Sequence, residues 1–239
     1  RTESDLIGSR EVPESALYGV QTLRGIENFR ISKFHLNEYP LFIQALAITK
    51  MGAAVANREL DLLTEEQADA ILKACKEILE GKHHDQFPVD MIQGGAGTTT
   101  NMNANEVIAN RALELMGHQR GEYQYCSPND HVNRSQSTND AYPTAIHIGL
   151  YYTHLKLVKH FEVLIESFRK KATEFAHVIK MGRTQLEDAV PMTLGQTFNG
   201  FASILRHEVK NLDFAAQDFL TVNMLSLIHI SEPTRLALI

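Results

Sequence analysis

The feature that most constrains the fold is a long run of apolar side chains at helical spacing in the second half of the chain. They step mostly by three and four positions: Ile148, Tyr151, Leu155, Val158, Phe161, Ile165, Phe168, Ala172 and Phe175. Such spacing places side chains along one side of an α-helix. At 1.5 Å per residue, the run corresponds to roughly 40 Å of helix. Leu157 and Leu164 widen the stripe, so we expect more than one side of this helix to be buried.

A second run of the same spacing follows a polar break at residues 182–185. Its members are Leu194, Phe198, Phe201, Leu205, Val209, Leu212, Phe219 and Val222. Pro191 stands where we expect the first turn of this second helix. Two long, broadly apolar helices joined by a loop are half of an elongated bundle. No strand-like alternation of useful length is apparent, so the sequence predicts an all-α protein.

The first half of the chain predicts an irregular arm followed by shorter helices. Residues 1–37 contain many turn formers and little periodicity, which indicates an arm without regular structure. We expect helices over residues 40–62, and from the capping box Thr64–Gln67 to a stop at Gly81. A third helix should end at Gly117.

These elements predict an N-terminal helical domain over residues 1–135 and the start of a central helical-bundle domain over residues 136–224. Residues 225–235 resemble the translation of a sequencing adapter read in frame. We therefore expect residues 225–239 to be a non-native tail, with the natural sequence cut near Met224. An ordinary apolar tail is the alternative.

The composition argues against several classes of partner. The 239 residues carry a net charge of -6 and no basic block, which argues against nucleic acid. No window approaches 18 uninterrupted apolar residues, so no membrane span is expected. The chain starts without an apolar signal segment, and Cys75 and Cys126 are too few for a disulfide framework. We therefore expect a cytoplasmic protein.

Three polar turns next to predicted helix starts are the candidate functional segments: Gly94–Thr98, Gln136–Asp140 and Gly182–Gln185. Helix starts carry unpaired N–H groups and the positive end of the helix dipole, so they suit anions. Each turn is also consistent with a plain connector between helices. If the three converge, they form a pocket for a small anion.

Two other kinds of site are not supported by these motifs. The run Gly94–Thr98 lacks the Gly-Lys-Ser/Thr end of a P-loop and the preceding strand of a dinucleotide fingerprint. The eleven histidines fit neither a His-x-x-x-His nor a Cys/His ligand pattern, so we predict no metal-ligating residues.

The longer motifs resemble the aspartase/fumarase superfamily. They are residues 94–98 with 101–107, residues 128–133 with 136–140, and residues 182–191 with 194–196. The resemblance runs from about Asp5 to Met224 and is strongest to the aspartate ammonia-lyase branch. Gly-Ala-Gly-Thr, Ser-Thr-Asn and Gln185 stand where fumarases usually have Gly-Ser-Gly-Thr, Ser-Ser-Asn and His.

The resemblance implies reversible elimination of ammonia from L-aspartate to give fumarate, without an organic cofactor. An activating divalent metal at an unassigned site is left open. By the same resemblance, the residues that hold this small dicarboxylate are Thr98, Ser137, Thr138 and Asn139, with Thr184 and Gln185 completing the pocket. Arg24 and Lys50 match family positions with supporting roles.

One departure from the family concerns the catalytic base. The family's base is a serine in a mobile loop well beyond residue 224, and each active site is assembled from three subunits of a homotetramer. We therefore expect the intact protein to be a lyase, and this chain to contain no catalytic residue and to be inactive. A fumarase or another superfamily lyase is one alternative, and a non-catalytic structural homologue is another.

Overall fold

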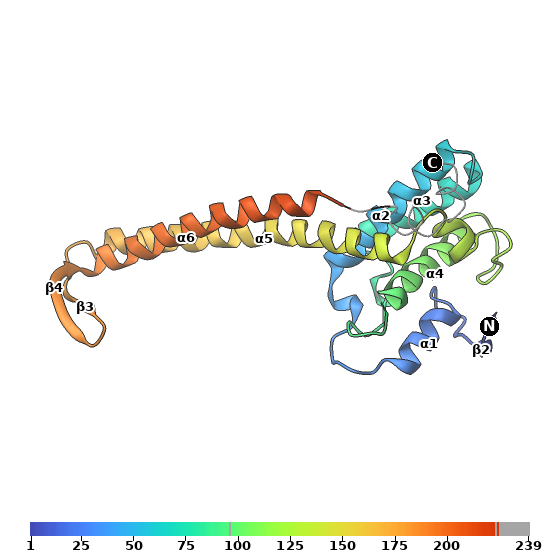
Figure 1. Cartoon of the computed structure of the whole chain (residues 1–239), viewed down its shortest axis with the longest axis horizontal. Helices are drawn as coiled ribbons and strands as arrows, with labels where there is room; N and C mark the ends of the chain where they lie inside the picture. The colour runs from blue at the N-terminus through green and yellow to red at the C-terminus, as the bar shows by residue number, and fades with distance from the viewer. Residues whose placement is uncertain (96, 223, 225–239) are drawn as a thin grey trace, which may run out of the picture. The chain divides into compact units, whose positions relative to one another are not determined.

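The computed structural model describes residues 1–95, 97–222 and 224, and helices dominate it (Figure 1). The strands in this part of the chain form two small antiparallel pairs, β1–β2 and β3–β4. The expected all-α class is therefore confirmed, with short hairpins added. The predicted domain ranges 1–135 and 136–224 remain predictions, and the expected tail at residues 225–239 lies outside the described residues.

The chain forms two compact units, the first containing Arg1–Gly149 and the second Leu150–Thr221. The elements of the first unit are β1 (Thr2–Asp5), β2 (Gly8–Glu11), α1 (Val20–Asn28), η1 (Leu36–Glu38), α2 (Pro40–Glu59), α3 (Glu65–Leu79), η2 (His84–Gln86), α4 (Thr98–Leu115), the π-helical turn η3 (Pro128–Val132) and the first turns of α5 (Thr138–Glu174). Its core is formed mainly by α2, α3 and α4, whose inward side chains include Ile43, Leu46, Ile71, Ile78, Val107, Ile108 and Leu113.

The predicted helix signals in this unit are confirmed. The hydroxyl of Thr64 accepts a hydrogen bond from the backbone N–H of Gln67, and the Gln67 side chain accepts one from the N–H of Thr64. Gly81 and Gly117 follow the C-caps of α3 and α4 with φ of +88° and +83°. This left-handed conformation carries no steric penalty for glycine, so both helices stop where the sequence predicts.

The prediction of an irregular arm over residues 1–37 is wrong, because it contains the hairpin β1–β2 and the helix α1. The N-cap Gly19 has no side chain to cap α1, and Glu3 on β1 accepts a hydrogen bond from the backbone N–H of Val20 at 3.0 Å. The rest of the cap comes from Glu106 on α4, which accepts hydrogen bonds from the backbone N–H groups of Gly19, Gln21 and Thr22 at 2.8, 2.8 and 3.0 Å. The positive end of the helix dipole also stabilises a negatively charged carboxylate at this position. Local sequence signals could not reveal a cap supplied from so far along the chain.

The second unit is a helical hairpin. It contains α5 from Leu150 on, β3 (Ile179–Thr184), β4 (Glu187–Thr193), α6 (Leu194–Ala216) and η4 (Gln217–Leu220), and α6 runs back along α5 (Figure 1). The Phe168 ring lies 6.1 Å from that of Phe198, centroid to centroid, and 5.6 Å from that of Phe201. His154 on α5 lies 2.9 Å from the Asp213 carboxylate on α6.

Two expectations for this unit are corrected. The polar break at residues 182–185 belongs to the hairpin β3–β4, and Pro191 pairs with Met181 in that hairpin instead of starting a helix. Helix α6 begins at Leu194, where Thr193 forms a capping box with Gln196. Among the described residues, burial of more than one side of α5 is also not seen. Ile165 is 7% exposed, whereas Leu157 and Val163 are 43% and 68% exposed.

Candidate functional site

The glycine-rich loop, by which we mean residues 90–95 and Gly97, is anchored at its start by the buried Asp90 carboxylate. Its oxygens accept hydrogen bonds from the N–H groups of Ile31, Ser32 and Ile92 at 2.9, 2.7 and 2.7 Å. The Ser32 hydroxyl adds a fourth at 2.8 Å. Burial raises the pKa of this carboxyl, but the hydrogen bonds outweigh that effect and lower the pKa to about 2. The carboxylate therefore fixes the loop to the segment that follows α1.

The middle of the loop is fixed by Gln93, which caps α4 from outside the helix. Gln93 Oε1 accepts a hydrogen bond from the backbone N–H of Thr100 at 2.8 Å, and Gln93 Nε2 donates to Thr100 Oγ1 at 2.7 Å. Thr100 is the third residue of α4, so an N–H group that a helix start leaves unpaired finds its partner here. The loop and the first turn of α4 are therefore one hydrogen-bonded structure.

Gly97 lets the loop approach α5 closely. It is the N-cap of α4 and has φ +84°, a left-handed conformation that favours glycine. A Cβ atom at this position would also overlap the ring of Tyr142 on α5. Both the backbone conformation and the packing therefore require glycine here.

The start of α5 carries the second predicted polar turn. The helix begins at Thr138, and the hydroxyl of Ser137, directly before it, accepts a hydrogen bond from the N–H of Asn139 at 3.2 Å. The predicted helix start is thus confirmed. Asn101 on α4 donates from Nδ2 to Thr138 Oγ1 at 3.0 Å, which ties the two helix starts together.

Beside these helix starts lies Lys50 on α2, a fully buried side chain. Its Nζ donates to Asn101 Oδ1 at 2.7 Å, Asn133 Oδ1 at 2.9 Å and Gln136 Oε1 at 3.0 Å. These bonds connect α2, α4 and the residues before α5. Burial lowers the pKa of the Lys50 ammonium to about 7.

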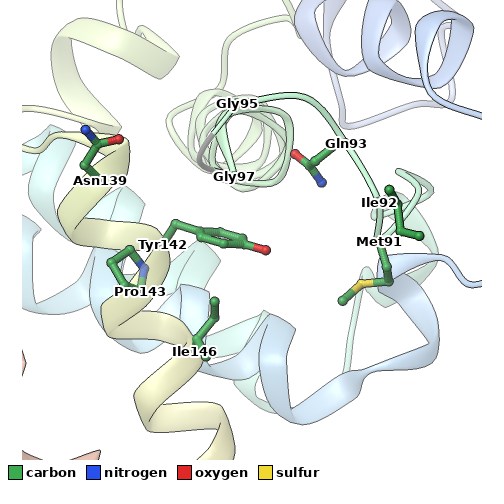
Figure 2. A pocket seen from close by; sticks show the side chains of 9 residues that line it. All are labelled: Met91, Ile92, Gln93, Gly95, Gly97, Asn139, Tyr142, Pro143 and Ile146. Carbon is green, nitrogen blue, oxygen red and sulfur yellow. The ribbon is translucent and has the colours of Figure 1, made fainter. Parts of the chain in front are cut away.

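A cavity of about 510 Å³ lies between the glycine-rich loop and the first turns of α5 (Figure 2). Its lining comprises Met91, Ile92, Gln93, Gly95, Gly97, Asn139, Tyr142, Pro143 and Ile146. Figure 2 shows the Tyr142 ring crossing the space, with its hydroxyl directed away from α5. Burial raises the pKa of that hydroxyl, so it stays a hydrogen-bond donor at neutral pH. The volume suits a small molecule.

The four predicted residues of the first unit lie at two helix starts. Thr98 is the first residue of α4, and Ser137, Thr138 and Asn139 surround the first residue of α5. Asn139 lines the cavity, and Thr98 directly follows the cavity residue Gly97. Two helix N-termini bordering one cavity offer N–H donors and positive potential, a combination that attracts an anion.

Thr184 and Gln185 belong to the second unit. Thr184 ends β3 and pairs with Glu187 across the hairpin, and Gln185 occupies the turn with φ +52°. Both side chains are exposed, and neither lines the cavity described above. Their predicted part in the site remains a prediction.

Sequence reasoning did not select Gln93 or Tyr142. Tyr142 follows Asn139 by three residues, so helical spacing places the two on one face of α5, and that spacing could have signalled the tyrosine. The role of Gln93 as a cap for α4 carries no local signal. Arg24 donates to both oxygens of Asp5 at 2.8 Å and thereby links β1 to α1, and its predicted supporting role in the site remains a prediction.

Two kinds of feature are absent from the described residues. No group of three His, Cys, Asp or Glu side chains there is arranged to hold a metal ion. None of the helices in residues 1–95, 97–222 and 224 has the length and hydropathy of a membrane span.

Comparison with known proteins gives consistent matches over nearly the whole chain. A family model described as lyase matches residues 8–227. Aspartate ammonia-lyase of Escherichia coli K12 is 56% identical over 225 residues, which are 94% of this chain and 47% of that protein. The enzyme of the same name from Helicobacter pylori J99 is 57% identical over 89% of this chain and 45% of its own length. The chain thus spans about half the length of these relatives.

Solved structures match equally well. A fumarate lyase:delta crystallin from Brucella melitensis superimposes with a TM-score of 0.91 at 51% identity, covering 93% of this chain and 50% of that one. A class II fumarase from Schistosoma mansoni gives a TM-score of 0.86 at 36% identity, covering 93% and 47%.

Proposed function

Because this chain belongs to the lyase family, we propose that the intact protein is an ammonia-lyase that converts L-aspartate to fumarate and ammonia. Relatives that carry the name aspartate ammonia-lyase, at 56–57% identity, support this reaction. The observation that carries the proposal is the cavity between the glycine-rich loop and the start of α5, bordered by two helix N-termini.

The proposed reaction removes a proton from Cβ of L-aspartate and breaks the Cα–N bond, and the electron pair of the C–H bond becomes the new C=C bond. The Cβ proton is weakly acidic, so negative charge accumulates on the adjacent carboxylate before ammonia leaves. Preorganised donors that bind this charge stabilise the transition state more than the substrate. No organic cofactor takes part in the proposed reaction.

The proposed roles follow from the positions of the donors. Thr98 at the start of α4 and Ser137, Thr138 and Asn139 at the start of α5 bind the substrate carboxylates and amino group. The hydroxyls of Ser137 and Thr138 already accept hydrogen bonds from the Asn139 N–H and from Asn101 Nδ2, so these two groups need little ordering when the substrate binds.

We propose that the site is completed in a homotetramer in the cytoplasm. Thr184 and Gln185 would then reach the pocket of an assembled active site that draws on three subunits. The exposed apolar side chains of the second unit support such an assembly, among them Val163, Ile204 and Phe214 at 68%, 61% and 82% exposure. Packing of the second units of several copies against one another would bury these side chains.

The 239-residue chain itself is proposed to be inactive, because the serine base of this family lies beyond residue 224. A fumarase is the second candidate, favoured by the match to the class II fumarase of Schistosoma mansoni. A non-catalytic structural homologue is a third possibility from the sequence, and loss of the serine loop in the intact gene would favour it.

The test is the absorbance of fumarate formed by the intact protein with L-aspartate, and separately with L-malate. We expect fumarate from L-aspartate and no more than trace formation from L-malate. The reverse preference would replace the proposal with a fumarase, and no product from either would reject a lyase of these substrates. Substantial turnover by the 239-residue chain would reject its proposed inactivity.

A further inference from the structure

Tyr142 brings an unused hydrogen-bond donor to the cavity between the glycine-rich loop and α5. The residue is part of the cavity lining, and Figure 2 shows its hydroxyl directed away from the helix. None of the described residues forms a hydrogen bond with this hydroxyl. Polar groups that folding removes from water normally have a hydrogen-bond partner, so an unused donor in a cavity points to a ligand.

The position of the hydroxyl is set by the packing of the Tyr142 ring. A Cβ atom at Gly97 would overlap the ring, so the ring lies directly against the backbone of the loop. The ring of Phe42 packs edge-on against it, with 5.7 Å between the centroids and 66° between the planes. A tyrosine has two χ angles, so a ring held by two neighbours leaves its hydroxyl little freedom. A ligand that accepts from this hydroxyl therefore loses little affinity to ordering of the side chain.

The other polar side chains of the cavity differ in how far they are already used. Gln93 Nε2 donates to Thr100 Oγ1 at 2.7 Å and to the backbone carbonyl of Asp90 at 3.1 Å, so both of its hydrogens have partners. Asn139 is exposed beside the start of α5. The other side chains of the described lining carry no polar hydrogen: Met91, Ile92, Pro143 and Ile146. Within the described lining, Asn139 and Tyr142 are thus the side chains that can donate to a ligand.

These two donors serve different parts of the cavity. Asn139 and Tyr142 lie on one face of α5 at a spacing of about 5–6 Å between Cβ atoms, but their side chains differ in length. In Figure 2 the Tyr142 hydroxyl lies on the side of the ring that faces Met91, and Asn139 lies on the other side. An apolar lining such as Met91 and Ile92 strengthens a hydrogen bond to a charged group. An extended dicarboxylate carries a charge at each end, so it can use both donors.

We propose that Tyr142 is a further substrate-binding residue that selects for a second carboxylate: its hydroxyl donates a hydrogen bond to the carboxylate that lies farther from the starts of α4 and α5. This inference rests on the proposed function, since it takes L-aspartate and fumarate as the ligands. The carboxylate nearer the helix starts is bound by Thr98 and residues 137–139, as proposed above. A monocarboxylate of the same length offers the hydroxyl no acceptor, so Tyr142 discriminates against it.

The experiment compares Tyr142→Phe with the wild type in the intact protein. The substitution removes one oxygen atom, and the ring keeps its packing against Gly97 and Phe42. Because no described residue bonds to the hydroxyl, its loss should leave the urea midpoint unchanged, and a change in affinity then reports a contact with the ligand. Tyr39→Phe, at a tyrosine that is 41% exposed and outside the cavity lining, is the matched control.

Isothermal titration calorimetry gives the affinities for fumarate and for crotonate, which has a methyl group in place of one carboxylate. We expect Tyr142→Phe to weaken fumarate binding at least tenfold, as loss of one hydrogen bond to a charged group does. The same substitution should weaken crotonate binding less than twofold. Tyr39→Phe should change neither affinity by more than twofold.

The outcomes separate this role from the proposed function. Equal fumarate affinity in the wild type and Tyr142→Phe would overturn the role of Tyr142 and leave the proposed function standing. Equal losses for fumarate and crotonate would also overturn it, because the hydroxyl would then not recognise the second carboxylate. If the wild type neither binds fumarate nor converts L-aspartate, the proposed function itself fails. Where crotonate binds both proteins too weakly for calorimetry, the fumarate comparison decides.

Discussion

The two units of this chain differ in what they bury. The first unit encloses polar side chains, among them Lys50, Asn101 and Glu106, each at 2% exposure or less. The second leaves large apolar side chains in solvent, including Val163 and Phe214. Buried polar groups are costly unless they are hydrogen-bonded, and here they hold the loop, the helix starts and the arm in place. The polar groups of the first unit thus position the candidate site, whereas the exposed apolar side chains of the second unit are the surface that we propose contacts other copies of the chain.

The contrast is tested most strongly at Glu106, the buried cap of α1. We expect Glu106→Ala to lower the free energy of unfolding by about 4 kcal/mol, because three backbone N–H groups and the Thr22 hydroxyl lose their acceptor. Urea denaturation followed by circular dichroism measures this loss. The control, Glu106→Gln, keeps one acceptor oxygen and should lose less. A loss below 1 kcal/mol for Glu106→Ala would mean that the buried polar groups of the first unit are dispensable.

A smaller, pH-dependent effect is expected at Asp90. Its pKa of about 2 in the folded protein lies below the ordinary value of 3.8, so the ionised carboxylate stabilises the fold above pH 4. That contribution is lost as the pH falls from 4 through 2. Asp90→Asn should therefore reduce stability at pH 7, and the difference from wild type should shrink towards pH 2. Urea midpoints between pH 2 and pH 7 measure it, with the exposed Asp85→Asn as control. A constant difference across this range would contradict the assignment.

The smallest effect on stability, and a large one on association, is expected in the second unit. Val163→Ser together with Ile204→Ser replaces two exposed side chains and should change the free energy of unfolding of the chain by less than about 0.5 kcal/mol. Sedimentation velocity should nevertheless show smaller species than for wild type. Leu6→Ser, in the exposed turn of the β1–β2 hairpin, is the matched control. If association is unchanged in the double variant, these faces do not join copies of the chain.

Local signals predicted much of this fold. The capping box at Thr64, the stops at Gly81 and Gly117 and the start of α5 depend on residues a few positions apart, so the sequence alone shows them. Helix α1 was missed because its cap, Glu106, comes from α4. Pro191 was misread because an edge strand tolerates a missing N–H as readily as the first turn of a helix does.

For the candidate site, the sequence identified the two polar turns but not the packing between them. Asn139 and the glycine-rich loop could be predicted from residue types that suit helix starts and close approach. Gln93 belongs to the site because it bonds to Thr100, and Tyr142 because its ring packs against Gly97. Only the folded chain creates these two contacts. The hydrogen bonds of Lys50 likewise bring together residues about 50 to 86 positions away in the chain.

The cap that Glu106 supplies to α1 also has a consequence for synthesis of the protein on the ribosome. Gly19 and Glu106 are 87 residues apart, so the N-terminal arm leaves the ribosome long before its partner exists. At typical translation rates of about 5–20 residues per second, the wait is roughly 4 to 17 s. During that interval the backbone N–H groups of Gly19, Gln21 and Thr22 lack the acceptor that Glu106 provides in the folded chain. The arm is therefore synthesised well before α4 and reaches its final structure only after α4 has emerged.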